Sequence, residues 1–245
     1  MRKLLIAALA ALTAIAAVSI ANAQTGPGAE VTVSVSPEKV GTKKKPKPTK
    51  VNLEIVNSDS TQTADGLTIF QPKQIKVSTD GIKKCKLSNL EAAPDPSSCP
   101  AKSKVGSGHA DAVAGVNGTS PSSLTFNVTA FVIGDKKIAF LLQQQGGQIN
   151  TVATGTYKRA GSGYGTKLVV DIPQIAREFP PGTFNGLKGL ETSLYKKVGK
   201  HSLYKSTGCP STRTLQFKAV IHFMANPNPP KAEEVTATGG ADCHK

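Results

Sequence analysis

Tryptophan is absent from this chain of 245 residues, and aromatic residues make up only 5% of it. Flat aromatic side chains are what single-stranded nucleic-acid grooves use for stacking, so nucleic-acid binding is disfavoured, and sugar recognition by aromatic platforms is disfavoured for the same reason. Acidic residues are also scarce, with 16 Asp and Glu against 30 Lys and Arg, and the formal net charge is +14. Such a chain attracts anions. No pair of acids stands out as the two carboxylates of a glycosidase.

The first 23 residues have the pattern of a cleavable secretory signal. Arg2 and Lys3 supply the cationic start, residues 4–20 are almost entirely apolar, and Ala21-Asn22-Ala23 is a small-x-small cleavage site. The alanine-rich apolar stretch is typical of a bacterial signal. Its removal lowers the formal charge from +14 to +12, because Arg2 and Lys3 leave with it. We therefore expect an extracellular or cell-envelope protein with no transmembrane anchor after cleavage.

Cysteine usage agrees with export. The chain has four cysteines, an even number, which in an exported protein predicts disulfides. Spacings of the C-x-x-C kind that hold zinc are absent. Four cysteines allow three pairings, and proximity in the sequence favours Cys85 with Cys99 and Cys209 with Cys243.

Alternation of apolar and polar residues, with a period of two, dominates the rest of the chain. The clearest examples are residues 31–35, 51–55, 124–132 and 215–223, and Gly134-Asp135 is a hairpin turn signal between residues 124–132 and 137–142. About ten strands are expected, with one short helical turn at residues 88–92 that has Ser88 as its N-cap. This pattern predicts an all-β antiparallel β-sandwich, immunoglobulin-like or jelly-roll-like. A flexible leader at residues 24–30 precedes a single domain at residues 31–245.

A lysine- and proline-rich loop at residues 37–50 interrupts the alternation. Its prolines remove backbone donors and its like charges repel one another, which predicts an extended, solvated segment. The loop is the candidate anion-binding site, through Lys43, Lys44, Lys45 and Lys47.

Catalytic patterns in the sequence are weak. Ser-x-x-Lys occurs at Ser36, Ser193 and Ser202, but these serines lie in strand-like or turn-like segments, and no partner motif accompanies them. The glycine-rich run at residues 161–167 lacks the Gly-Lys-Ser/Thr of a phosphate cradle and precedes a strand. Among the four histidines, His109 alone lies in a glycine- and serine-containing segment of the kind that forms catalytic loops. His222 is expected on the polar face of its strand. A Ser-His-Asp triad assembled only in three dimensions stays open.

One segment is familiar. Cys85-Lys86-Leu87, followed by Cys99-Pro100 and the residues up to Ala110, resembles a Cys-x-Leu…Cys-Pro-x-x-Ser-x-Val-Gly-x-Gly-x-Ala pattern in uncharacterised exported β-rich proteins of actinobacteria. The loop around residues 41–46, Cys209 and Cys243 are also similar to that group. The resemblance implies an exported, sandwich-like protein with locally paired cysteines, and it implies no activity.

The sequence thus favours a secreted or envelope-associated β-sandwich that is not an enzyme, has no metal or cofactor, and has a structural or adhesive role. Two alternatives are an anion-binding module for acidic envelope polymers and a secreted hydrolase. The expected partners are acidic cell-envelope polymers or another envelope protein.

Overall fold

The computed structural model describes residues 28–58, 60–116, 118, 121–161, 163–224 and 234–245. The predicted signal peptide, residues 1–23, lies outside them. Residues 29 and 30 of the predicted leader already belong to the first strand. None of the helices in the described part of the chain is long and apolar enough to cross a membrane.

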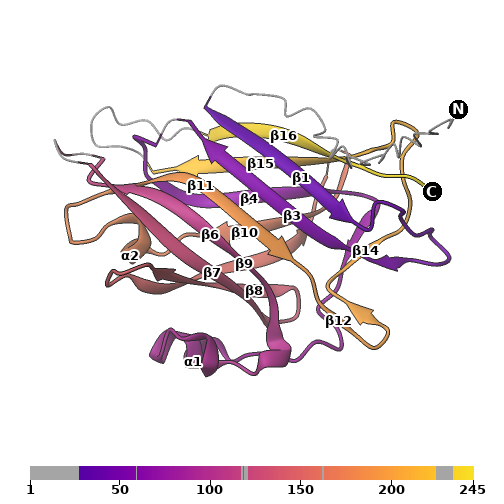
Figure 1. Cartoon of the computed structure of the whole chain (residues 1–245), viewed down its shortest axis with the longest axis horizontal. Helices are drawn as coiled ribbons and strands as arrows, with labels where there is room; N and C mark the ends of the chain where they lie inside the picture. The colour runs from indigo at the N-terminus through magenta and orange to yellow at the C-terminus, as the bar shows by residue number, and fades with distance from the viewer. Residues whose placement is uncertain (1–27, 59, 117, 119–120, 162, 225–233) are drawn as a thin grey trace, which may run out of the picture.

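Eleven antiparallel strands form one sheet in the order β1-β3-β11-β6-β7-β8-β9-β10-β4-β15-β16 (Figure 1). Three short strands, β2, β14 and β5, form a second small sheet, and β12 pairs with β13. The strands are β1 Ala29–Ser36, β2 Lys47–Pro48, β3 Lys50–Asn57, β4 Ala64–Pro72, β5 Ile75–Val77, β6 Lys104–Ala114, β7 Ser122–Gly134, β8 Lys137–Gln144, β9 Asn150–Arg159, β10 Tyr164–Asp171, β11 Asn185–Leu194, β12 Lys197–Val198, β13 His201–Ser202, β14 Tyr204–Ser206, β15 Thr214–Phe223 and β16 Glu234–Asp242. The helices are α1 Leu87–Ala92 and α2 Gln174–Arg177, with 3-10 turns at Pro96–Ser98 and Ala101–Ser103.

The predicted all-β antiparallel class is confirmed. Alternate residues of each strand point inward because the side-chain period of a strand is two, and the apolar set of residues 215–223 is buried as the alternation predicts. The predicted hairpin at Gly134-Asp135 joins β7 to β8. The main strands belong to one continuous sheet, and this sheet curls until it is nearly barrel-shaped.

Eleven is an odd number, so the first and last strands of the curled sheet point the same way and do not continue the antiparallel ladder. They meet instead by close packing. A Cβ atom at Gly239 of β16 would lie 2.3 Å from the carbonyl oxygen of Val31 in β1, so only glycine fits there. Just beyond the two strands, Lys39 and His244 form a parallel bridge, in which the Val40 N–H donates to the His244 carbonyl over 3.0 Å.

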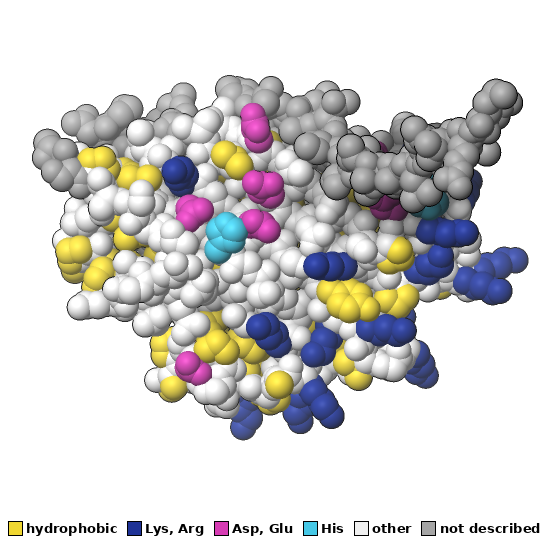
Figure 2. All heavy atoms as spheres, viewed as in Figure 1, with side chains coloured by type: hydrophobic (Ala, Val, Ile, Leu, Met, Phe, Trp, Pro, Cys, Tyr) yellow, Lys and Arg dark blue, Asp and Glu magenta, His cyan; other side chains and the backbone are white. Residues whose placement is uncertain are grey.

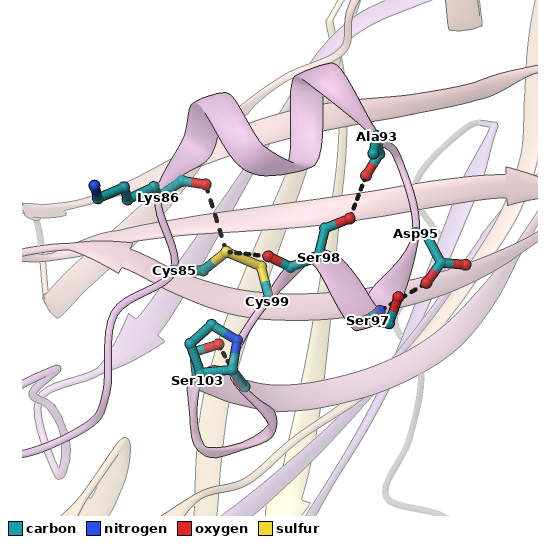
Figure 3. The surroundings of a disulfide bond; sticks show 9 residues. Cys85, Lys86, Ala93, Asp95, Ser97, Ser98, Cys99 and Ser103 are labelled. Carbon is teal, nitrogen blue, oxygen red and sulfur yellow. Dashed lines mark hydrogen bonds between the residues drawn. A yellow bond between two sulfur atoms is a disulfide. The ribbon is translucent and has the colours of Figure 1, made fainter.

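A connection of 31 residues numbered 73–103 covers the outer face of β7, β8 and β9. Its α1 buries Leu90 against Phe131 and Leu141, which point out of the sheet, so a second apolar cluster forms outside the curled sheet. The Cys85–Cys99 disulfide cross-links this covering segment on either side of α1 (Figure 3). The predicted helical turn is therefore present, but the predicted cap is wrong. Helix α1 begins after Lys86 without a side-chain cap, because Ser88 is already inside the helix.

Both disulfides have the pairing that proximity in the sequence favours. Cys85 and Cys99 have Cα atoms 5.2 Å apart, and Cys209 and Cys243 have Cα atoms 5.7 Å apart. The second disulfide ties the connection between β14 and β15 to the residue after β16. Two disulfides are typical of a protein that folds in an oxidising compartment.

We expect Gly239→Ala to lower the free energy of unfolding by about 1–3 kcal/mol, because the added methyl group collides with the backbone of β1. Gly161→Ala is the control, since a Cβ atom at Gly161 meets nothing within 4 Å. Urea unfolding of both variants measures the difference. Equal stability of the two variants would show that β1 and β16 can move apart to accommodate a side chain at residue 239.

Candidate functional site

The interior of the curled sheet contains an apolar cavity of about 110 Å³. Inward side chains of β4 and of β6 to β11 line it, together with Ala176 of α2. Nearly all of its lining surface is carbon. Among the described residues that line it, only Asn185 and Thr192 have polar side chains.

Small residues on β6 explain why this space stays empty. Ala110 and Ala112 line the cavity where neighbouring strands contribute Phe126, Phe140 and Leu168. Short side chains on one strand of a curled sheet leave room that the long ones opposite do not fill. The small residues from Gly106 onward are the signal for this space in the sequence.

Helix α2 lies across one end of the cavity. The Asn185 side-chain amide donates to the Ala176 carbonyl over 3.1 Å, which fastens the helix to β11. The lining residues Ile172, Ala176 and Leu187 are partly exposed at this end, and Ile175 of α2 is 41% exposed. The cavity therefore approaches solvent beside α2, and we call this side of the molecule the α2 end.

The opposite, inner end of the cavity is polar. A second cavity of about 10 Å³ lies beyond it, and the two share Ile69, Leu168, Thr192 and Leu194 as lining residues. Gln71 and Tyr204 also line the small cavity. The Gln71 amide nitrogen donates to the Tyr204 hydroxyl over 3.2 Å.

Two tyrosines complete this polar end. The Tyr157 and Tyr204 hydroxyl oxygens are 2.7 Å apart, and the rings meet edge to face. Burial raises the pKa of Tyr204 to about 12, and burial together with the neighbouring Tyr204 raises the pKa of Tyr157 well above 10.0. Both hydroxyls therefore stay neutral at physiological pH, and the inner end of the cavity carries no charge.

A hydrogen-bonded chain of Thr68, His222 and Glu234 crosses the outer face of the sheet. The His222 Nε2 atom is 2.9 Å from the Thr68 hydroxyl, and its Nδ1 atom is 2.8 Å from the Glu234 carboxylate. This is the order of hydroxyl, base and acid in a catalytic triad. However, β4 pairs with β10 on one side and β15 on the other, so its backbone N–H groups belong to the sheet and offer no oxyanion hole beside Thr68.

The residues singled out in the sequence do not converge on one site. His109 lies on the outer face, where its Nε2 atom is 3.7 Å from a Glu191 carboxylate oxygen, and it does not line the cavity. The three Ser-x-x-Lys serines lie in β1, β11 and β13, so no helix brings a lysine beside them. Of the glycine-rich run, residues 164–167 belong to β10, which pairs with β9 in an antiparallel arrangement. The predicted orientation of His222 toward the polar face is confirmed.

The predicted extended loop is instead a folded turn. The Thr42 N–H donates to the Lys45 carbonyl over 3.0 Å, and the Gly41 N–H donates to the Ser206 hydroxyl over 3.1 Å. Close packing makes this possible, because Gly41 lies against the backbone of Lys45 and Ser206 where no Cβ atom fits. Lys43, Lys44 and Lys45 are exposed on the turn, whereas Lys47 is half-buried and donates to the Lys39 carbonyl over 3.3 Å.

No protein-family model, curated protein or solved structure matches this chain. Within the described ranges, no group of three or more His, Cys, Asp and Glu side chains is arranged to hold a metal ion. Cavity and surface chemistry are therefore the basis for a functional assignment.

The stability of the protein should fall as the pH rises above about 10, where the unfolded chain releases tyrosine protons that the folded Tyr157 and Tyr204 retain. The contribution is fully present below pH 10 and is lost as the pH approaches 12. We expect Tyr157→Phe combined with Tyr204→Phe to flatten this decline, as measured by denaturant unfolding between pH 9 and pH 12. An unchanged slope would contradict the burial of the two hydroxyls.

Proposed function

We propose that this chain is an exported, non-enzymatic binding protein that holds one small apolar molecule inside its curled sheet. The cavity beneath β6 to β11 is the observation that supports this proposal. An empty cavity destabilises a protein by roughly 24 cal/mol per Å³, so about 110 Å³ costs on the order of 2–3 kcal/mol. A purely structural or adhesive protein gains nothing from that loss, whereas a carrier needs the space.

The approach beside α2 fits the same proposal. An apolar molecule enters most readily where few hydrogen bonds must open, and α2 is a helix of four residues with no buried side chain of its own. A hydrogen bond from the Asn185 side chain to the Ala176 carbonyl links β11 to this helix. Displacing α2 therefore opens the cavity without breaking the main sheet.

A fluorescent apolar probe that carries a short alkyl chain should bind and become brighter, and Ala110→Leu should weaken its binding at least tenfold, because the larger side chain fills the cavity from β6. Ser107→Leu is the matched control, since Ser107 is exposed on the other face of the same strand. Equal binding by both variants would place the probe on the surface and contradict the proposal.

A second function, binding of an acidic polymer, is supported by the distribution of charge. Of the 30 Lys and Arg residues, 27 lie in the described ranges. Only Arg177 and Lys188 of these lie in the half of the structure nearer the α2 end. The others gather at the opposite end, which we call the basic end, and Figure 2 shows them along the side of β14, β12 and α1.

The basic end is made by the connections that the antiparallel order brings together there. β2, which follows the turn at residues 42–45, pairs with β14. The hairpin of β12 and β13, which precedes β14 in the chain, adds Lys196, Lys197 and Lys200. Few carboxylates neutralise these cations. Lys84 pairs with Asp135, and this is the one Lys–carboxylate ion pair found in the described part of the chain. The remaining lysines are available to an extended polyanion.

Replacing Lys43, Lys44 and Lys45 by Gln should lower the salt concentration at which the protein leaves a heparin column, because three exposed cations are lost from one turn. Lys44→Gln and Lys188→Gln each remove one positive charge, the first at the basic end and the second at the α2 end. Lys44→Gln should shift elution more than Lys188→Gln. If Lys188→Gln has the same effect, retention reflects total charge and the basic end is no specific surface.

A further inference from the structure

We propose that the ligand is an uncharged apolar molecule with one hydroxyl group, and that this hydroxyl lies at the inner end of the cavity against Gln71 and Thr192. The inference rests on the proposed binding function and names the class of ligand. It begins from two buried side chains that each have one polar atom without a hydrogen-bond partner in the described part of the chain. Gln71 is 2% exposed and Thr192 is 3% exposed, and neither Oε1 of Gln71 nor Oγ1 of Thr192 has a hydrogen-bond partner.

Unpartnered polar atoms in an apolar interior are costly, because each loses its bonds to water without replacement. One amide atom of Gln71 lacks a hydrogen-bond partner whichever way the amide is oriented. With the nitrogen toward Tyr204, the amide oxygen is free, and with the oxygen toward Tyr204, the amide nitrogen is free. A hydroxyl group both donates and accepts, so it satisfies either arrangement as well as the Thr192 hydroxyl.

The sizes of the two cavities match a hydroxyl on an apolar chain. A cavity needs about 10–15 Å³ to hold one water molecule, so the inner cavity of about 10 Å³ accommodates a group of hydroxyl size. For comparison, a cavity of about 150 Å³ binds benzene, so the main cavity of about 110 Å³ has room for roughly four or five carbon atoms, and a longer apolar chain would extend toward the α2 end. Thr192 lines both cavities, so the polar group and the apolar chain meet there.

Charge excludes an ionised head group. None of the described residues that line either cavity is a Lys, Arg or His, and the Tyr157 and Tyr204 hydroxyls are held in their neutral form. A carboxylate at Gln71 would therefore be buried without a counter-ion, which costs far more than its hydrogen bonds return. The basic end does not alter this, because its lysines are on the surface.

The test compares three compounds of similar size, namely 1-octanol, nonane and octanoate, in displacement of a bound fluorescent apolar probe from the full chain. We expect 1-octanol to bind roughly three- to tenfold more tightly than nonane, which is the effect of one or two net hydrogen bonds. Octanoate should bind most weakly at neutral pH.

Variants that keep the volume identify the contact. Thr192→Val and Gln71→Met should each remove most of the preference for 1-octanol over nonane, measured as the ratio of the two affinities within each variant. Thr192→Ser should retain the preference, because it keeps the hydroxyl. Thr156→Val is the control, since Thr156 is on the outward-facing register of β9.

The outcomes separate this inference from the function on which it rests. Equal binding of 1-octanol and nonane would overturn the inference and leave the binding function standing, since a water molecule would then satisfy Gln71 and Thr192. Tighter binding of octanoate than of 1-octanol would contradict the proposal that the ligand's head group is uncharged. If none of the three compounds displaces the probe and the probe itself does not bind, the proposed function fails.

Discussion

The meeting of β1 and β16 is the constraint on which the rest of the structure depends. Ten antiparallel pairings give eleven strands, and the two outermost strands then run in the same direction. The sheet encloses an interior only if these strands approach without a regular ladder, and Gly239 permits the approach by presenting no side chain to Val31. Once β1 and β16 are in contact, the inward residues of all strands face one another and form a common core.

The core is not uniformly filled, and its emptier half is where we propose that a ligand binds. Under β1, β3, β15 and β16 it is packed with residues such as Val33, Ile55 and Phe217. Under β6 to β11 the alanines of β6 leave a cavity whose inner end holds polar atoms without partners. Both features reduce stability in the empty protein, and the two disulfides offset such losses by restricting the unfolded chain.

The two ends of the curled sheet have different chemistry. Antiparallel order places alternate connections at the same end, so the turn at residues 42–45, the covering segment and the β12–β13 hairpin meet at the basic end, far along the sequence from one another. Helix α2 and the approach to the cavity are at the other end. An acidic polymer on the basic end would therefore leave the approach to the cavity unobstructed.

The sequence by itself determined the elements and their covalent links. Alternation of apolar residues is a local property of the chain, so strands such as residues 215–223 and the turn at Gly134-Asp135 were predictable, and short separations favoured the two disulfides that form. The tertiary structure alone decided that the strands form one curled sheet, that Thr68, His222 and Glu234 meet, and that the cavity joins Ala110 to Gln71 and Thr192. These features depend on which strands become neighbours and on what volume the inward side chains leave unfilled. The apolar–polar period of a single strand determines neither of them.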